Sequence, residues 1–244
     1  MVVKVIRPHK NEQKEKESKK KDKKKRKVKV KKINRVGIDL GSGRTYATVY
    51  YSKGDRIKTY VNYLFKNPVY EMIREINFLQ SKTVLTTSEI NKIDKLKKKV
   101  IKESHKMVRD IIINVLSYKP DIITIENIDI DGMKYSNYNN NKIKDARKFN
   151  NFIDMCDFKY FEKYLNKKCK KRHIKLRKAD SKFPSTKLCH YCGGWNYVTN
   201  EKQFNCTHCG KLIIRDENSA KLLSRYDVYE YEKYLYNKSK KYYK

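Results

Sequence analysis

Residues 35–51 read RVGIDLGSGRTYATVYY, and this stretch decides the fold class. Apolar and polar side chains alternate along it as in strands, and GDRIKTYVNYLF, residues 54–65, continues the alternation. Turns are predicted at residues 41–44 and 53–54, where glycines occur. Asp39 interrupts the apolar run VGIDL, where a buried charge is costly unless it is paired or holds a metal ion. Two or three adjacent strands are therefore predicted, with a candidate metal ligand in the first.

Helical and strand patterns alternate further along the chain. Apolar residues recur every three to four positions over residues 90–116, which predicts a helix. DIITIENIDI, residues 121–130, is rich in β-branched residues and predicts a buried parallel strand. Glu126 lies at its carboxyl end, where ligand sites gather in α/β sheets. A helical pattern over residues 141–170 and a strand in KRHIKLRKAD, residues 171–180, complete the order expected of an α/β domain.

Four of the six cysteines form two CxxC pairs. Cys189 and Cys192 are followed, after thirteen residues, by Cys206 and Cys209, and a glycine stands directly after each pair. Two such turns on a hairpin place four thiolates at the corners of a tetrahedron, which is the geometry of a structural zinc site. Two disulfides or a redox-active CxxC are the alternatives, although redox motifs do not come as paired turns. We therefore predict that these cysteines bind Zn²⁺.

Other side chains of this segment are expected to support it. His190 and His208 lie inside the two pairs, and we expect them to be exposed, because four thiolates already satisfy the ion. Trp195, Tyr197 and Phe204 are expected to pack the small ribbon, with stacking on a nucleobase as the alternative.

Three further residues in helical segments carry reactive groups. Cys156 and Cys169 lie apart from the CxxC pairs, and we expect them to be buried or neutral helix residues. His105, in ESHKMVRDII, is expected to be structural.

A third acidic residue, Asp216, follows the ribbon in IIRDENSAKLLSRY, residues 213–226. The apolar residues there predict a helix with a buried face, and Asp216 stands at or just before its start, as a helix N-terminal acid or as a ligand. Asp39, Glu126 and Asp216 each lie at the end of an element. Oxygen ligands suit Mg²⁺, and two such ions serve phosphodiester hydrolysis. The alternative is three unrelated acids: an ion-paired Asp39, a strand-end Glu126 and a helix-capping Asp216.

Together these stretches resemble a known family. GIDLGSGRTYATV, DIITIENIDI and ADSKFPSTKLCHYCG with FNCTHCGKLIIRDENSAKLL closely resemble the RuvC-like nuclease half of TnpB, the transposon-associated RNA-guided nuclease, and of the related type V CRISPR effectors. The resemblance covers roughly residues 34–226. It implies an α/β, RNase H-like mixed sheet flanked by helices, with an inserted four-cysteine zinc ribbon. It also implies that Asp39, Glu126 and Asp216 are catalytic and bind Mg²⁺ or Mn²⁺.

The resemblance also divides the chain. The predicted parts are a disordered basic leader (1–33), the first part of the RuvC-like nuclease domain (34–184), the zinc ribbon (185–214), and a closing helix with a basic aromatic tail (215–244). Family members carry a sizeable guide-RNA-binding region ahead of the nuclease, whereas only the basic leader precedes the first strand here. DNA, a guide RNA and a partner chain that supplies the missing region are therefore the expected partners. Ser219 stands where the family usually has alanine.

The charge of the chain favours a nucleic-acid partner. Its 244 residues include 60 Lys and Arg against 27 Asp and Glu, a net charge of +33 that is densest in residues 12–32. Binding a polyanion releases condensed counterions. An anionic membrane surface, or a lysine excess that reflects only AT-rich codons, are the alternatives. No apolar run is long enough to span a membrane, and no secretory signal is seen. We expect a cytoplasmic, nucleoid-associated location, or a nuclear one in a eukaryotic host.

The residues and the resemblance lead to one main functional hypothesis, a metal-dependent DNA endonuclease of the TnpB type, minimal or truncated. The alternative is a non-catalytic DNA- or RNA-binding accessory or repressor protein derived from such a nuclease. DLGSGRT, residues 39–45, also resembles the first phosphate loop of actin-like ATPases. However, a second glycine-rich loop is not visible, and a four-cysteine ribbon is foreign to that fold.

Overall fold

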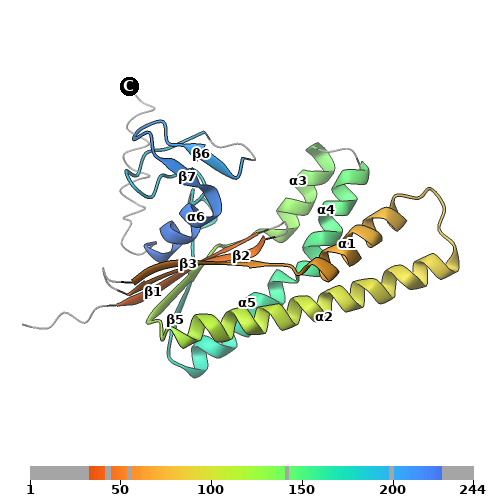
Figure 1. Ribbon diagram of the computed structural model, residues 1–244, viewed down its shortest axis with the longest axis horizontal. Helices are drawn as coiled ribbons and strands as arrows, with labels where there is room; N and C mark the ends of the chain where they lie inside the picture. Colours follow the sequence, from red (N-terminus) through yellow and green to blue (C-terminus); the bar gives the residue numbers. More distant parts are fainter. Residues whose placement is uncertain (1–32, 42–44, 54–56, 141–142, 198–200, 227–244) are drawn as a thin grey trace, which may run out of the picture. The chain divides into compact units, whose positions relative to one another are not determined.

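The computed structural model describes residues 33–41, 45–53, 57–140, 143–197 and 201–226. Most of the predicted basic leader and the tail beyond residue 226 lie outside them. The described part contains a five-stranded sheet, a two-stranded sheet and helices (Figure 1). None of the helices described is long and apolar enough to cross a lipid bilayer.

The elements follow one another in a strand-rich first part, a helical middle and a small ribbon before the last helix. The strands of the large sheet are β1 (Asn34–Leu40), β2 (Thr45–Lys53), β3 (Ile57–Leu64), β4 (Ile122–Ile125) and β5 (Lys175–Lys178). The small sheet consists of β6 (Gln203–Asn205) and β7 (Leu212–Ile214). The helices are α1 (Asn67–Gln80), α2 (Thr87–Ser117), α3 (Ile130–Asn140), α4 (Ile143–Cys156), α5 (Phe158–Lys171) and α6 (Arg215–Ser224). The predicted strands and the predicted helix over residues 90–116 are confirmed, whereas α1 and α3 were not predicted.

The large sheet is mixed, as predicted. Its strand order is β3-β2-β1-β4-β5, in which β1, β2 and β3 are antiparallel neighbours and β4 and β5 run parallel to β1. All four residues of β4 are buried, which is typical of a parallel strand covered on both faces. Because β1 and β4 are parallel, their carboxyl ends lie at the same edge of the sheet.

The two faces of the sheet are covered by different helices. Val36 and Ile38 belong to the main core, to which α1, α2, α4 and α5 contribute apolar side chains. Side chains alternate along a strand, so Gly37 and Asp39 face the other side. There α6 packs on β1, β2 and β4, opposite α2 and α5 (Figure 1). A Cβ atom at Gly37 would lie 1.9 Å from the carbonyl oxygen of Ala220, so only glycine allows α6 to approach this closely.

Local signals set the bounds of the helices. A capping box between Thr86 and Glu89 begins α2, because each side chain bonds to the backbone of the other. The predicted helical region over residues 141–170 is divided at Asp157, which is left-handed with a φ of 46°. Its side chain accepts a hydrogen bond from the Tyr160 N–H and begins α5. The prediction of one continuous helical region was therefore wrong at this residue.

Reactive side chains in this helical part belong to the core and its rim. Cys156 and Cys169 are buried in the main core, and burial raises the pKa of both thiols, that of Cys169 to about 11. His105 stacks on Tyr160 and lies 2.8 Å from the Asp157 carboxylate. These contacts agree with the structural roles expected from the sequence.

Candidate active site and metal centre

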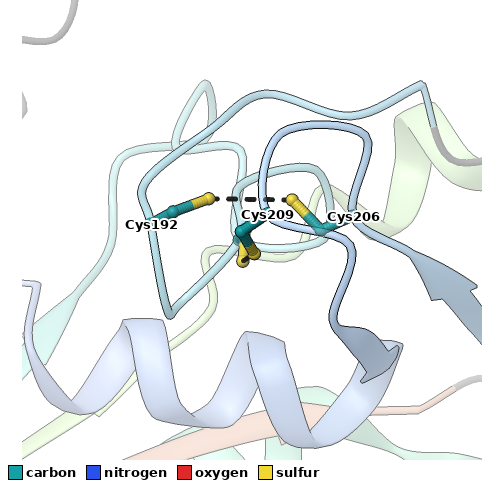
Figure 2. A group of neighbouring side chains, drawn as sticks. Cys192, Cys206 and Cys209 are labelled. Atoms are coloured by element: carbon teal, nitrogen blue, oxygen red, sulfur yellow. Dashed lines mark hydrogen bonds between the residues drawn. The ribbon is translucent and has the colours of Figure 1, made fainter.

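The four cysteines predicted as zinc ligands lie together. Their sulfur atoms are all within 4.8 Å of one another. The Cys189 and Cys209 Sγ atoms are 3.8 Å apart. The Sγ atoms of Cys192 and Cys206, joined by the dashed line in Figure 2, are 3.7 Å apart. A tetrahedral zinc ion with bonds of about 2.3 Å requires sulfur–sulfur edges of about 3.8 Å. All four are free thiols, too far apart for disulfides, so this donor set fits zinc.

Each CxxC pair folds back through a glycine. The Gly193 N–H donates to the Cys189 carbonyl oxygen at 2.8 Å, and the Gly210 N–H donates to the Cys206 carbonyl oxygen at the same distance. Both glycines are left-handed, with φ of 72° and 70°, a region that other residues enter at a cost. The glycine that follows each pair is therefore what closes the turn around the thiols.

The two histidines of the ribbon differ from each other. His208 is exposed, as predicted, and its Nε2 atom lies 2.8 Å from the Trp195 carbonyl oxygen. His190 is half-buried, so the prediction that it is exposed was wrong. Its ring Nδ1 atom lies 2.9 Å from Asn218 Oδ1, and burial lowers the pKa of the ring to about 4. The sequence pattern gives no sign of this contact, because Asn218 belongs to α6.

The aromatic residues of the ribbon only partly follow the prediction. Trp195 packs against a small core that includes Leu222 and Leu223, and Phe204 packs beside the cysteines. Tyr197 is 92 % exposed, so its predicted packing role was wrong. Tyr191 is also exposed, and the Lys211 Nζ atom lies 4.2 Å from the centre of its ring. This face of the ribbon therefore presents aromatic and cationic groups together.

The three acids predicted for catalysis gather where α6 crosses the sheet. Asp39 is the last residue but one of β1, and Glu126 directly follows β4. The parallel register pairs Gly37 with Thr124, so Asp39 and Glu126 follow on the same face of neighbouring strands. Asp216 lies in the first turn of α6, which packs on both strands.

The electrostatics show that the three carboxylates are neighbours. Asp39 is only 7 % exposed, and its pKa lies well above the usual range because of burial first, and then repulsion from Glu126 and Asp216. Burial also raises the pKa of Glu126, while Arg215 opposes this shift and Asp216 adds to it. The Arg215 Nε–H donates to Asp216 Oδ1 at 3.2 Å. Within the described residues, only the cysteines bring three ligand atoms within 4.8 Å of one another. The three carboxylates are therefore not as closely grouped as the thiols.

Three polar side chains on the Asp39 side of the sheet were not predicted to belong to the site. Thr48 faces Asp39 across the β1–β2 pair, and its buried hydroxyl donates to Asn62 Oδ1 at 2.8 Å. The buried Ser219 hydroxyl lowers the pKa of Asp39, although it makes no hydrogen bond of ordinary length within the described part. The period-two alternation of β2 and β3 could have placed Thr48 and Asn62 on this face, since both point to the side of Asp39.

The carboxylate group opens to solvent beside Glu126. A cavity of about 580 Å³ lies there, and apolar residues from several elements line much of it, among them Leu40, Met133 and Phe149. Asn127 adds an amide to its wall. Of the three predicted catalytic acids, Glu126 lines this cavity, so a ligand can reach the site from this side at Glu126.

Comparisons with known proteins agree with this architecture. Residues 158–223, which run from α5 through the ribbon into α6, match the family described as Cas12f1-like, TNB domain. The structure of a Cas12f1–sgRNA–target DNA complex has a TM-score of 0.57 and 17% identity, covering 78% of this chain and 49% of that chain. None of the curated proteins matches the chain.

Two other solved structures are less similar to this chain. A CRISPR-Cas12f ternary complex has a TM-score of 0.45 and 17% identity, over 78% of this chain and 38% of that chain. CasPhi-2 (Cas12j) bound to crRNA has a TM-score of 0.41 and 11% identity, over 78% of this chain and 48% of that chain. This chain thus spans about half the length of the Cas12f1 chain that it resembles. The mixed α/β fold is shared with Cas12f1, and together with the matching domain it confirms the predicted resemblance to TnpB and the type V Cas12 effectors.

Proposed function

We propose that this chain is the RNase H-like (RuvC-like) nuclease part of a TnpB- or Cas12f-type RNA-guided nuclease and hydrolyses phosphodiester bonds of DNA. One observation carries the proposal: Asp39, Glu126 and Asp216, which are far apart in sequence, meet at one point of a Cas12f1-like fold, where Glu126 and Asp216 add to the raised pKa of the buried Asp39. Grouped buried carboxylates destabilise a fold unless a cation compensates them.

The alternative of three unrelated acids is less well supported. Among the described residues, no ion pair to Asp39 within 4.0 Å is seen, although it is almost fully buried. Glu126 is not merely a strand-end acid either, because it lies in the electrostatic field of Asp216. A site that attracts a divalent cation accounts for both observations.

The roles of the residues follow from their positions. Asp39, Glu126 and Asp216 would hold Mg²⁺ or Mn²⁺, which when bound activates water and stabilises the leaving oxygen. Asp39 supplies a carboxylate that packing on both sides keeps in place. Glu126 borders the open cavity, where a phosphodiester can approach. Arg215 is partly exposed beside Asp216, and its guanidinium can contact a substrate phosphate.

The cysteine ribbon is proposed to hold a structural Zn²⁺ through Cys189, Cys192, Cys206 and Cys209. The sulfur spacing of 3.7 and 3.8 Å supports this assignment, because it matches the edge of a zinc tetrathiolate. A chain with four thiolates in place needs no further ligand, so the ion would stabilise the ribbon rather than act on substrate.

The partners are proposed by extension. The solved Cas12f1 complex contains a guide RNA and target DNA, and we extend both to this chain. The net charge of +33 supports a polyanionic partner of either kind.

The test is a cleavage assay with end-labelled single- and double-stranded DNA, with and without bound RNA, in Mg²⁺, Mn²⁺ or EDTA. Asp39→Asn, Glu126→Gln and Asp216→Asn should each abolish metal-dependent cutting. Asp94→Asn, at an exposed carboxylate of α2, is the matched control and should cut normally. Cutting that survives in Asp216→Asn would contradict the site. DNA binding without cutting under every condition would favour the non-catalytic accessory or repressor protein.

A further inference from the structure

Two buried asparagines organise the cysteine ribbon. Asn196 acts inside it: its Nδ2 group donates to the carbonyl oxygens of Lys187 and Gly194, at 3.3 and 3.0 Å. Its Oδ1 atom accepts from the backbone N–H and the hydroxyl of Thr207, at 2.9 and 3.2 Å. Asn196 therefore ties the first cysteine turn to the second.

Asn218 reaches the ribbon from outside it. It lies on α6, two residues after Asp216, and is fully buried. Its Nδ2 group donates to the carbonyl oxygens of Ser185 and Leu188, at 3.0 and 2.7 Å. Its Oδ1 atom accepts from the backbone N–H and from the ring Nδ1–H of His190, both at 2.9 Å. Every hydrogen-bonding position of this amide is used, and all partners flank the first cysteine.

These hydrogen bonds restrict movement of the cysteine cluster relative to the carboxylates. Leu188 and His190 are the immediate neighbours of Cys189, so a filled thiolate cluster fixes their backbone groups. Those groups in turn fix Asn218 and with it the first turn of α6, where Asp216 lies. A misplaced Asn218 would leave buried donors and acceptors unpaired, which strongly disfavours intermediate positions.

On this basis, and resting on the proposed function, we propose that Asn218 is a positioning residue that couples metal binding at the cysteines to metal binding at the carboxylates. Such coupling is reciprocal, so an ion in either cluster favours an ion in the other. Asn196 is not part of the coupling, because its contacts stay within the ribbon. The two asparagines thus have different roles although both are buried and similarly hydrogen-bonded.

The experiment measures Mn²⁺ binding by the electron paramagnetic resonance of free Mn²⁺, on the full chain with zinc saturated or removed by a chelator. In the wild type, zinc removal should weaken Mn²⁺ binding at least about fivefold. Asn218→Ala should bind Mn²⁺ as weakly with zinc as without it, while it retains bound zinc. Asn196→Ala should lose zinc more readily, yet bind Mn²⁺ normally once zinc is saturated.

Two results would overturn the coupling. One is wild-type Mn²⁺ affinity in zinc-saturated Asn218→Ala, and the other is an equal effect of zinc removal in both proteins. If Asn218→Ala does not fold, His190→Ala removes only the ring contact and should weaken Mn²⁺ binding in the same direction, less strongly. An unchanged affinity there would also refute the coupling. If the wild type binds Mn²⁺ no better than Asp39→Asn, the proposed nuclease site itself fails, which is a distinct outcome.

Discussion

Replacement of Gly37 by alanine should push helix α6 away from the sheet that it covers. The new Cβ would lie 1.9 Å from the Ala220 carbonyl oxygen and 2.4 Å from the Ser224 backbone nitrogen. Both atoms belong to the helix backbone, so no side-chain rotation relieves the overlap. A carbon–oxygen contact is comfortable at about 3.3 Å, which requires α6 to retreat by about 1.4 Å.

The loss of stability follows from the packing contacts that are lost when α6 moves away from the sheet. Ala220, Leu222 and Leu223 are fully buried, and a gap of this size removes a large part of their packing contacts. Overpacked cores lose about 1–3 kcal/mol, and we expect the upper end here, about 3 kcal/mol, since backbone must move. For a chain of this size that corresponds to a fall in melting temperature of about 6–12 °C.

The assay is urea and thermal unfolding followed by circular dichroism, with Mn²⁺ binding as a second readout of the position of Asp216. Gly210→Ala is the control, because its Cβ would meet nothing within 4 Å and only its φ of 70° is unfavourable. That variant should lose about 1 kcal/mol and keep α6 in place. A Gly37→Ala protein within about 0.5 kcal/mol of the wild type would refute the close approach of α6 to β1.

Three further predictions concern charge, thiols and a helix cap. In EDTA, the free energy of unfolding of the wild type should fall as pH rises from the ordinary carboxyl range to the raised pKa of Asp39, because the unfolded chain releases that proton first. Asp39→Asn should flatten this pH dependence when unfolding is measured across pH. The same pH dependence in both proteins would count against burial of the Asp39 charge. Zinc removal should make the exposed Cys192 and the partly exposed Cys209 reactive to alkylation in the folded protein while Cys156 and Cys169 stay protected, and mass spectrometry that finds Cys156 or Cys169 modified would contradict their burial. Thr86→Ala should lower the free energy of unfolding in urea by about 1 kcal/mol, since it removes the cap of α2, and no change would mean that the capping box contributes nothing.

Local patterns account for most of what the sequence predicted. The CxxC spacing, the alternation in β1 to β3 and the helical period of α2 are each set by residues close in sequence. Helix α1 carries comparable signals, with Pro68 in its first turn and apolar residues at Val69, Ile73 and Ile76, so residues 67–80 are predictable as a helix from the sequence.

Other features depend on which segments meet in space. Gly37 stands in an apolar strand, and only the approach of α6 shows why a side chain is excluded there. The contacts of Asn218 and the burial of His190 likewise join two elements that the sequence pattern treats separately. The hydrophobic spacing of a helix continues through Asp157, although the backbone of this residue is left-handed. The pattern does not reveal the break, because the break depends on one side-chain hydrogen bond rather than on hydrophobic spacing.

The position of α6 has a consequence for how the protein is made. Asp39 is synthesised near the start of the described chain, and its neighbour Asp216 follows 177 residues later. At ordinary translation rates of about 5–20 residues per second, the ribosome needs about 9–35 s to supply the second carboxylate after the first. During that interval β1 and β2 lack the helix that covers one face, and a chaperone has time to bind there. The carboxylate group is therefore completed only after the ribosome has synthesised α6, long after Asp39.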